Sequence, residues 1–68
     1  MGERHTEEMR LLGLTIAFYR RARGLTQSEL AEAVQISRTH MSNIEAPNTK
    51  TSISLNLLFD MLRHLTFR

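Results

Sequence analysis

The chain has 68 residues, of which 41% are hydrophobic, and this length supports a single small domain with a thin core. It contains no cysteine, which excludes disulfides and thiolate zinc sites, so its stability has to come from helix packing, with dimerisation as a further source. No apolar run is long enough to span a bilayer and the start does not resemble a signal peptide, so an intracellular, cytoplasmic protein is expected. The formal charge of +2, with a pI near 9.9, permits a polyanionic partner without demanding one.

The first predicted helix begins after Thr6, whose hydroxyl suits an N-cap. Glu7 and Glu8 fall in its first turn, where the helix dipole favours acids. Apolar residues at spacings of four and three are expected to form its inner face: Leu12, Ile16 and Tyr19. Its last turn carries arginines that compensate the dipole and are better explained that way than as a DNA footprint: Arg20, Arg21 and Arg23. Gly24 is expected to supply a left-handed cap.

A second and a third helix are predicted close together, joined by a turn of about three residues. Thr26 and Glu29 have the spacing of a capping box, so the second helix starts at Thr26. Ser37 is the expected cap of the third helix, which runs roughly over residues 38–45. The expected inner residues of the two helices are Leu30, Ala31, Val34, Met41 and Ile44. The residues expected on the outer face of the third helix are Arg38, Thr39, Ser42 and Asn43.

Pro47 bars continuation of the third helix, and residues 46–52 are predicted to form a loop. The last helix opens at Ser54, with Ser52 as an alternative cap. A stripe at helical period is expected to be core, with a part that extends onto a dimer surface: Leu55, Leu58, Phe59, Leu62 and Leu65. Two aromatic residues outside the stripes are candidate exposed contacts: Phe18 and Phe67. Residues 65–68 are interpreted as a short strand, a frayed helix end or a truncation.

This pattern resembles the lambda repressor/Cro-like (Xre family) helix-turn-helix domains over about residues 12–65. The residues that carry the resemblance are Leu12, Gly13, Ile16, Arg20, Gly24, Leu25, Thr26, Gln27, Glu29, Leu30, Ala31, Ile36, Ser37, Met41, Ser42, Asn43, Ile44 and Glu45. The resemblance implies an all-α fold, a compact bundle of four to five helices. It also implies one helix-turn-helix DNA-binding domain over residues 1–68, with a flexible N-terminus (1–6) and a tail (66–68).

The resemblance further implies roles for individual residues. Gln27 occupies the position where family members contact a DNA phosphate and brace the recognition helix. Arg20 and Glu45 match a family pair that forms a partly buried ion bridge, and we assign this pair to structure. The expected contacts to double-stranded DNA are Gln27, Ser37, Arg38, Thr39, His40, Ser42, Asn43 and Lys50.

The chemistry of these side chains leaves alternatives open. Arg38 could read guanine through its planar guanidinium, contact a phosphate, or remain solvated. Thr39 could touch a thymine methyl and Asn43 could pair with adenine, or both could simply be exposed. Ser37 could cap the helix or donate to a phosphate. His40 and Lys50 could each contact a phosphate or remain solvated. The only acid between residues 33 and 60 is Glu45, so the basic excess lies in this part of the chain.

Two departures from the family pattern affect these expectations. Gln35 lies in the turn where the family usually has a left-handed glycine, and another residue there costs roughly 1 kcal/mol. The turn is therefore expected to be slightly strained or differently shaped. Many relatives also continue past the fourth helix with a fifth helix or a strand that pairs two subunits, whereas this chain stops at Arg68, which leaves its dimer contact open.

Three functional hypotheses follow. The first is a sequence-specific transcription regulator, a repressor that acts as a homodimer on a two-fold operator. The second is an antitoxin-type module that binds a toxin or another regulatory protein as well as DNA, and the third is a fragment of a longer regulator. No enzyme activity, cofactor or metal is expected, since there is no phosphate loop or nucleophile–base set. The histidines lie on separate segments: His5, His40 and His64.

Overall fold

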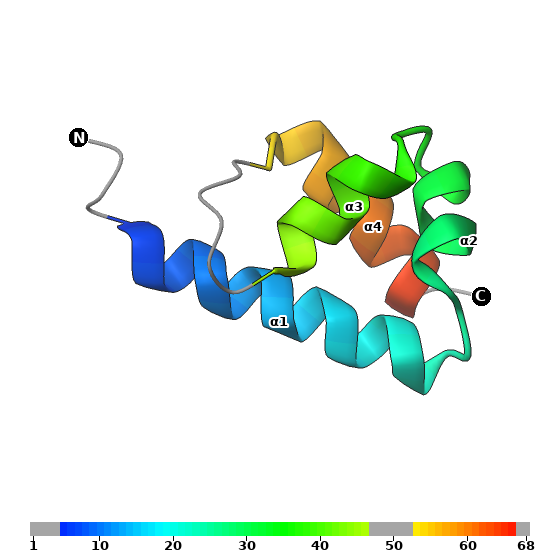
Figure 1. The fold of residues 1–68 in the computed structure, drawn as a ribbon, viewed down its shortest axis with the longest axis horizontal. Helices are drawn as coiled ribbons and strands as arrows, with labels where there is room; N and C mark the ends of the chain where they lie inside the picture. Colours follow the sequence, from blue (N-terminus) through cyan, green and yellow to red (C-terminus); the bar gives the residue numbers. More distant parts are fainter. Residues whose placement is uncertain (1–4, 47–52, 67–68) are drawn as a thin grey trace.

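The computed structural model describes residues 5–46 and 53–66, and this part of the chain is all-helical. Its helices follow in the order α1 (Thr6–Ala22), α2 (Gln27–Ala33), α3 (Arg38–Glu45) and α4 (Leu55–Thr66). Figure 1 shows the long α1 along one edge of the molecule. The three other helices all lie on the same side of α1. The predicted all-α bundle is confirmed, with four helices in the described part of the chain. Residues 1–4, 47–52 and 67–68 lie outside the described part, and with them the predictions made for Pro47, Lys50, Ser52 and Phe67.

The start of α1 differs from the prediction by one residue, whereas its end agrees with the prediction. The helix begins at Thr6 itself, with His5 as the N-cap and no side-chain cap bond, so the assignment of Thr6 as N-cap was wrong by one residue. At the other end Gly24 has a positive φ of 75°. The N–H of Leu25 donates to the carbonyl of Arg20 at 3.0 Å and that of Gly24 to Arg21 at 2.9 Å. These two bonds form a Schellman cap, which confirms the predicted left-handed end.

The inner face of α1 lies differently from the predicted one. The residues that are buried are Gly13, Ile16, Ala17 and Arg20. Leu12 is half-buried against the core, but Tyr19 is 47% exposed and forms a T-shaped pair with the Phe18 ring, with centroids 5.2 Å apart. Tyr19 was therefore wrongly placed on the inner face. The physical reason is that α1 is rotated so that Gly13 meets α3 and Arg20 reaches Glu45, which turns Tyr19 to the solvent.

The contact between α1 and α3 depends on the glycine in this face. A Cβ built on Gly13 would overlap the carbonyl oxygen of Ile44 and would lie 3.2 Å from its carbonyl carbon. A side chain would therefore force the two helices apart. Glycine lets the backbone of α3 lie directly against α1.

The inner face of α4 is also rotated from the predicted stripe. Ser54 caps the helix, since its Oγ accepts the N–H of Leu57 at 3.2 Å. The buried residues are Met61, which was not expected there, and Leu65. Three members of the predicted core stripe are instead exposed: Leu55 at 65%, Phe59 at 58% and Leu62 at 41%. The helix is apolar around much of its circumference, so its sequence allowed two packing faces, and the flexible Met61 fills the core.

The core lies where all four helices meet. Its buried residues are Ile16, Leu30, Ala31, Val34, Met41, Ile44, Met61 and Leu65. Those predicted from α2 and α3 are all among them. The helices include Thr6 and Thr66, which were assigned to the terminal segments, and α4 continues through Leu65 in place of a strand. Within the described ranges, no helix combines the length and the apolar character needed to cross a membrane.

Candidate nucleic-acid interface

The helix predicted to meet DNA, α3, has a buried back and a polar front. Ser37 caps it, because its Oγ accepts the N–H of His40 at 3.0 Å, as predicted. Met41 is fully buried and Ile44 is 5% exposed, so these two side chains fix the helix to the core. The exposed residues of α3 are Arg38, Thr39 and Asn43, and the half-buried ones are His40 and Ser42. The outer face therefore consists of charged and polar side chains, as major-groove contacts require.

The turn between α2 and α3 sets the angle at which α3 is presented. The N–H of Ile36 donates to the carbonyl of Ala31 at 2.9 Å, and that of Gln35 donates to Glu32 at 3.2 Å. This is the same Schellman pattern as at the end of α1. Here the left-handed residue is Gln35, with a φ of 63°. Of the two expected outcomes, a strained turn or a differently shaped one, the first agrees with this left-handed backbone, which an L-residue with a side chain adopts at some energetic cost.

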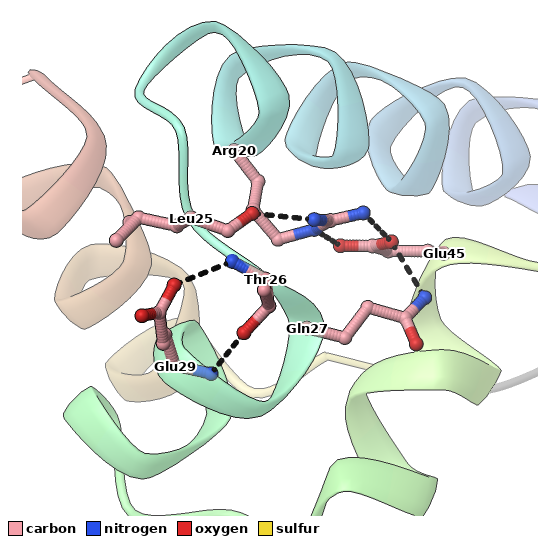
Figure 2. A network of polar contacts seen from close by, with 6 residues as sticks. All are labelled: Arg20, Leu25, Thr26, Gln27, Glu29 and Glu45. Carbon is pink, nitrogen blue, oxygen red and sulfur yellow. Dashed lines mark hydrogen bonds and ion pairs between the residues drawn. The ribbon is translucent and has the colours of Figure 1, made fainter.

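A buried polar network holds the C-terminal end of α3 (Figure 2). Arg20 donates from Nε to Oε2 of Glu45 at 2.7 Å and from Nη2 to Oε1 at 3.0 Å, which makes a bidentate pair. Its Nη1 donates to the carbonyl of Leu25 at 2.6 Å. Arg20 is 7% and Glu45 6% exposed, so the predicted ion bridge is confirmed and is almost fully buried.

Gln27 connects this network to the start of α2. Its Nε2 donates to Oε1 of Glu45 at 2.9 Å, and the residue is half-buried. The same first turn is held by the capping box, in which Thr26 and Glu29 exchange bonds of 2.8 and 3.0 Å. The implied brace on the recognition helix is therefore present.

The charges around the helix pair favour α3 as the contact surface. Glu45 is neutralised by Arg20 inside the protein, so α3 presents no unpaired negative charge. Arg38 is exposed at its N-terminal end. By contrast, α2 carries Glu29 and Glu32 on its surface. The helix pair is therefore not broadly basic, and an approach to DNA depends on the face of α3 and the neighbouring turn.

The predicted site residues within the described part come together on the α2–α3 unit. Gln27 opens α2, and the others follow from the cap of α3 onward: Ser37, Arg38, Thr39, His40, Ser42 and Asn43. Lys50 lies outside the described residues. Two structural contacts were missed by the sequence analysis, that of Gly13 with α3 and the bond from Nε of Arg23 to the carbonyl of Leu65 at 2.7 Å. Arg23 was assigned only to the helix dipole, and no local pattern points to a partner 42 residues away.

The three histidines lie apart, since His5 precedes α1, His40 belongs to α3 and His64 to α4. Over residues 5–46 and 53–66, no group of three or more potential metal ligands comes together.

Comparison with known families assigns this architecture. A helix-turn-helix family model matches residues 16–66, which spans all of α2, α3 and α4 and the larger part of the α1 contact face. The chain belongs to this family of helix-turn-helix domains, of the Cro and lambda repressor type. It is thus a DNA-binding domain of the kind found in transcription regulators. Comparisons with curated proteins and with solved structures gave no significant match.

Proposed function

We propose that the chain is a sequence-specific transcription repressor that places α3 in the major groove and binds a two-fold operator as a homodimer. The observation that carries the proposal is the polar front of α3, held on a buried back and braced at its end by Arg20, Gln27 and Glu45. A rigid, pre-positioned helix loses little entropy on binding, which supports specific recognition. Binding to chromosomal DNA also implies an intracellular location. The proposal assigns no catalytic step, cofactor or metal to the chain.

In this proposal the residues divide into two groups. Arg38, Thr39 and Asn43 face the bases, because they are the exposed side chains of α3. The remaining contacts are to the phosphate backbone, through Gln27, Ser37, His40, Ser42 and Lys50. These contacts set the register of the protein on the duplex and carry no sequence information themselves.

The test uses a duplex obtained by selection from a random pool. Arg38→Ala is expected to weaken binding to the preferred duplex by about 1–3 kcal/mol while leaving non-specific binding nearly unchanged. Arg63→Ala removes an exposed arginine of α4 and is the matched control, with no expected effect. Fluorescence anisotropy at several salt concentrations measures both, since phosphate contacts make the affinity fall steeply with salt.

The outcomes separate the possible roles of Arg38. Equal weakening on all duplexes, with a salt slope reduced by about 1, would make it a phosphate contact. An unchanged affinity would remove it from the interface. A protein whose affinity for DNA does not respond to salt would contradict the repressor proposal as a whole.

A second candidate is an antitoxin-type module that also binds a partner protein. The exposed row on α4, formed by Leu55, Phe59 and Leu62, favours it, because large apolar side chains in a row are typical of protein contacts. Co-expression with a toxin encoded beside this chain, followed by size-exclusion chromatography, would distinguish a stable complex from the free regulator.

A further inference from the structure

A second exposed apolar row lies on α1, on the face turned away from the rest of the protein. Leu11, Leu14 and Phe18 follow at spacings of three and four residues, and they are 51%, 38% and 63% exposed. Figure 1 shows that α2, α3 and α4 all lie on the other side of α1. This row takes no part in the core or in the α3 face. It is a separate surface of the molecule.

The charges at the two ends of this row have opposite signs. Glu7 lies one turn before Leu11, and Arg21 lies one turn after Phe18, both on the same side of the helix. Glu7 forms an ion pair with Arg10 of its own helix, and the hydrogen bond from Arg10, followed by the attraction of its charge, lowers the pKa of Glu7. Arg21 is exposed and forms no ion pair within the described part of the chain.

We propose that this row is the contact surface for a second copy of the chain, with the two α1 helices packed antiparallel. Glu7 and Arg21 are each seven residues from Leu14, so a two-fold axis at Leu14 brings Glu7 against Arg21 of the partner subunit. In the proposed dimer the Glu7 carboxylate is therefore shared between Arg21 of the partner subunit and the arginine of its own helix with which it already pairs. The same axis brings Leu11 near Phe18 of the partner subunit and places the two Leu14 side chains together. An isologous contact of this kind is self-complementary in shape and in charge.

The exposed row on α4 lacks this complementarity. Its neighbours along the helix are Arg63 and Thr66, while Asp60, the acid of α4, lies on another face. An antiparallel α4 pair would therefore bring apolar residues together without pairing opposite charges. The α1 surface is the better match for a second copy.

The α1 pairing also leaves the candidate nucleic-acid interface open. Because α3 packs against Gly13, on the other side of α1, a dimer would have the order α3, α1, α1 and α3. Three interaxial distances of about 8–10 Å separate the two α3 helices by roughly 24–30 Å. This sum is shorter than the roughly 34 Å between half-sites on one face of DNA, so the half-site spacing does not serve as support for the α1 pair. The inference rests on the exposed row and its charges, and not on the proposed function.

The contact is small. A few side chains bury far less than the ~800 Å² per partner of a standard interface, so the dimer is expected to be weak and concentration-dependent.

Sedimentation equilibrium of the full chain, without DNA, measures the dissociation constant of the dimer directly. Phe18→Glu is expected to raise this constant at least about tenfold, because the change introduces a charge on each side of the two-fold axis. Phe59→Glu, at a residue of similar exposure on α4, is the matched control and should leave the constant unchanged.

Charge exchange tests the antiparallel register. Arg21→Glu is expected to weaken the dimer about three- to tenfold, since it places two carboxylates opposite each other, and adding Glu7→Arg should restore it. Circular dichroism of each variant confirms that it is folded. A chain that stays monomeric at millimolar concentration, or a dimer disrupted by Phe59→Glu but not by Phe18→Glu, would overturn the inference. Neither result bears on binding of one copy to a half-site, which tests the proposed function separately.

Discussion

Gly13 lies at the contact between α1 and α3. Because glycine has no side chain, α3 can approach α1 closely at this point. The backbone of Ile44 occupies the space that a Cβ would need. Backbone atoms cannot rotate away as a flexible side chain can, so any substitution here has to move a whole helix. The glycine of the family pattern thus has a packing role, which its place in the sequence alone did not show.

Gly13→Ala is expected to lower the free energy of unfolding by about 1–3 kcal/mol, because the overlap outweighs the better helix propensity of alanine. Urea denaturation followed by circular dichroism measures the loss. Thr15→Ala, at an exposed position of the same helix, is the control and should change stability by less than about 0.5 kcal/mol. A Gly13→Ala variant as stable as the parent would show that α3 can shift at no cost.

At the scale of elements, two helices end in the same motif with different residues. The end of α1 uses Gly24 and the end of α2 uses Gln35, both at positive φ. Glycine adopts this conformation freely, whereas glutamine pays for the contact between its Cβ and the backbone. The turn that presents α3 is therefore the strained one of the pair.

Gln35→Gly is expected to stabilise the protein by about 0.5–1 kcal/mol. It removes a penalty of about 1–2 kcal/mol and loses about 0.4–1 kcal/mol through the greater freedom of the unfolded chain. The melting temperature should rise by a few degrees, since about 1 kcal/mol shifts it by 4–8 °C in a domain of this size. Ala33→Gly, in the last turn of α2, serves as the control and should destabilise by up to about 1 kcal/mol. A lower melting temperature for Gln35→Gly would mean that the glutamine side chain makes a stabilising contact.

Most helix ends, the start of α1 excepted, could be predicted from the sequence because their chemistry is local. Each cap joins two residues that are three positions apart. Thr26 and Glu29 form the capping box, and the hydroxyls of Ser37 and Ser54 accept the N–H of His40 and Leu57. The faces of α2 and α3 were also predicted correctly, since each has few apolar residues and only one way to bury them.

The faces of α1 and α4 could not be predicted in the same way. In α4 the rows through Leu57, Met61 and Leu65 and through Leu55, Phe59 and Leu62 are equally apolar, and only the neighbouring helices decide which is buried. Likewise, Arg20 and Glu45 are 25 residues apart, so their pairing followed from the family resemblance and not from periodicity.

At the scale of the whole molecule, the network around Glu45 joins three helices that share a thin core. Arg20 belongs to α1, Gln27 to α2 and Glu45 to α3, and none of the buried side-chain polar atoms in the described part lacks a partner. A satisfied network of this kind fixes the mutual orientation of the helices more narrowly than apolar contacts do. A domain of 68 residues has a total stability of only about 3–10 kcal/mol, so the loss of one member should be felt throughout the fold.

Glu45→Ala is expected to destabilise the protein by about 3–5 kcal/mol, because the guanidinium of Arg20 would stay buried with only the carbonyl of Leu25 as a partner. Thermal unfolding should show a much lower melting temperature or no folded baseline. Replacing both charges, as Arg20→Met with Glu45→Leu, should cost clearly less, since no unpaired charge remains in the interior. The difference between the single and the double variant isolates the cost of the unpaired arginine from that of lost packing. If Glu45→Ala melted at the temperature of the parent, the ion pair would have to be screened by solvent, in conflict with its burial.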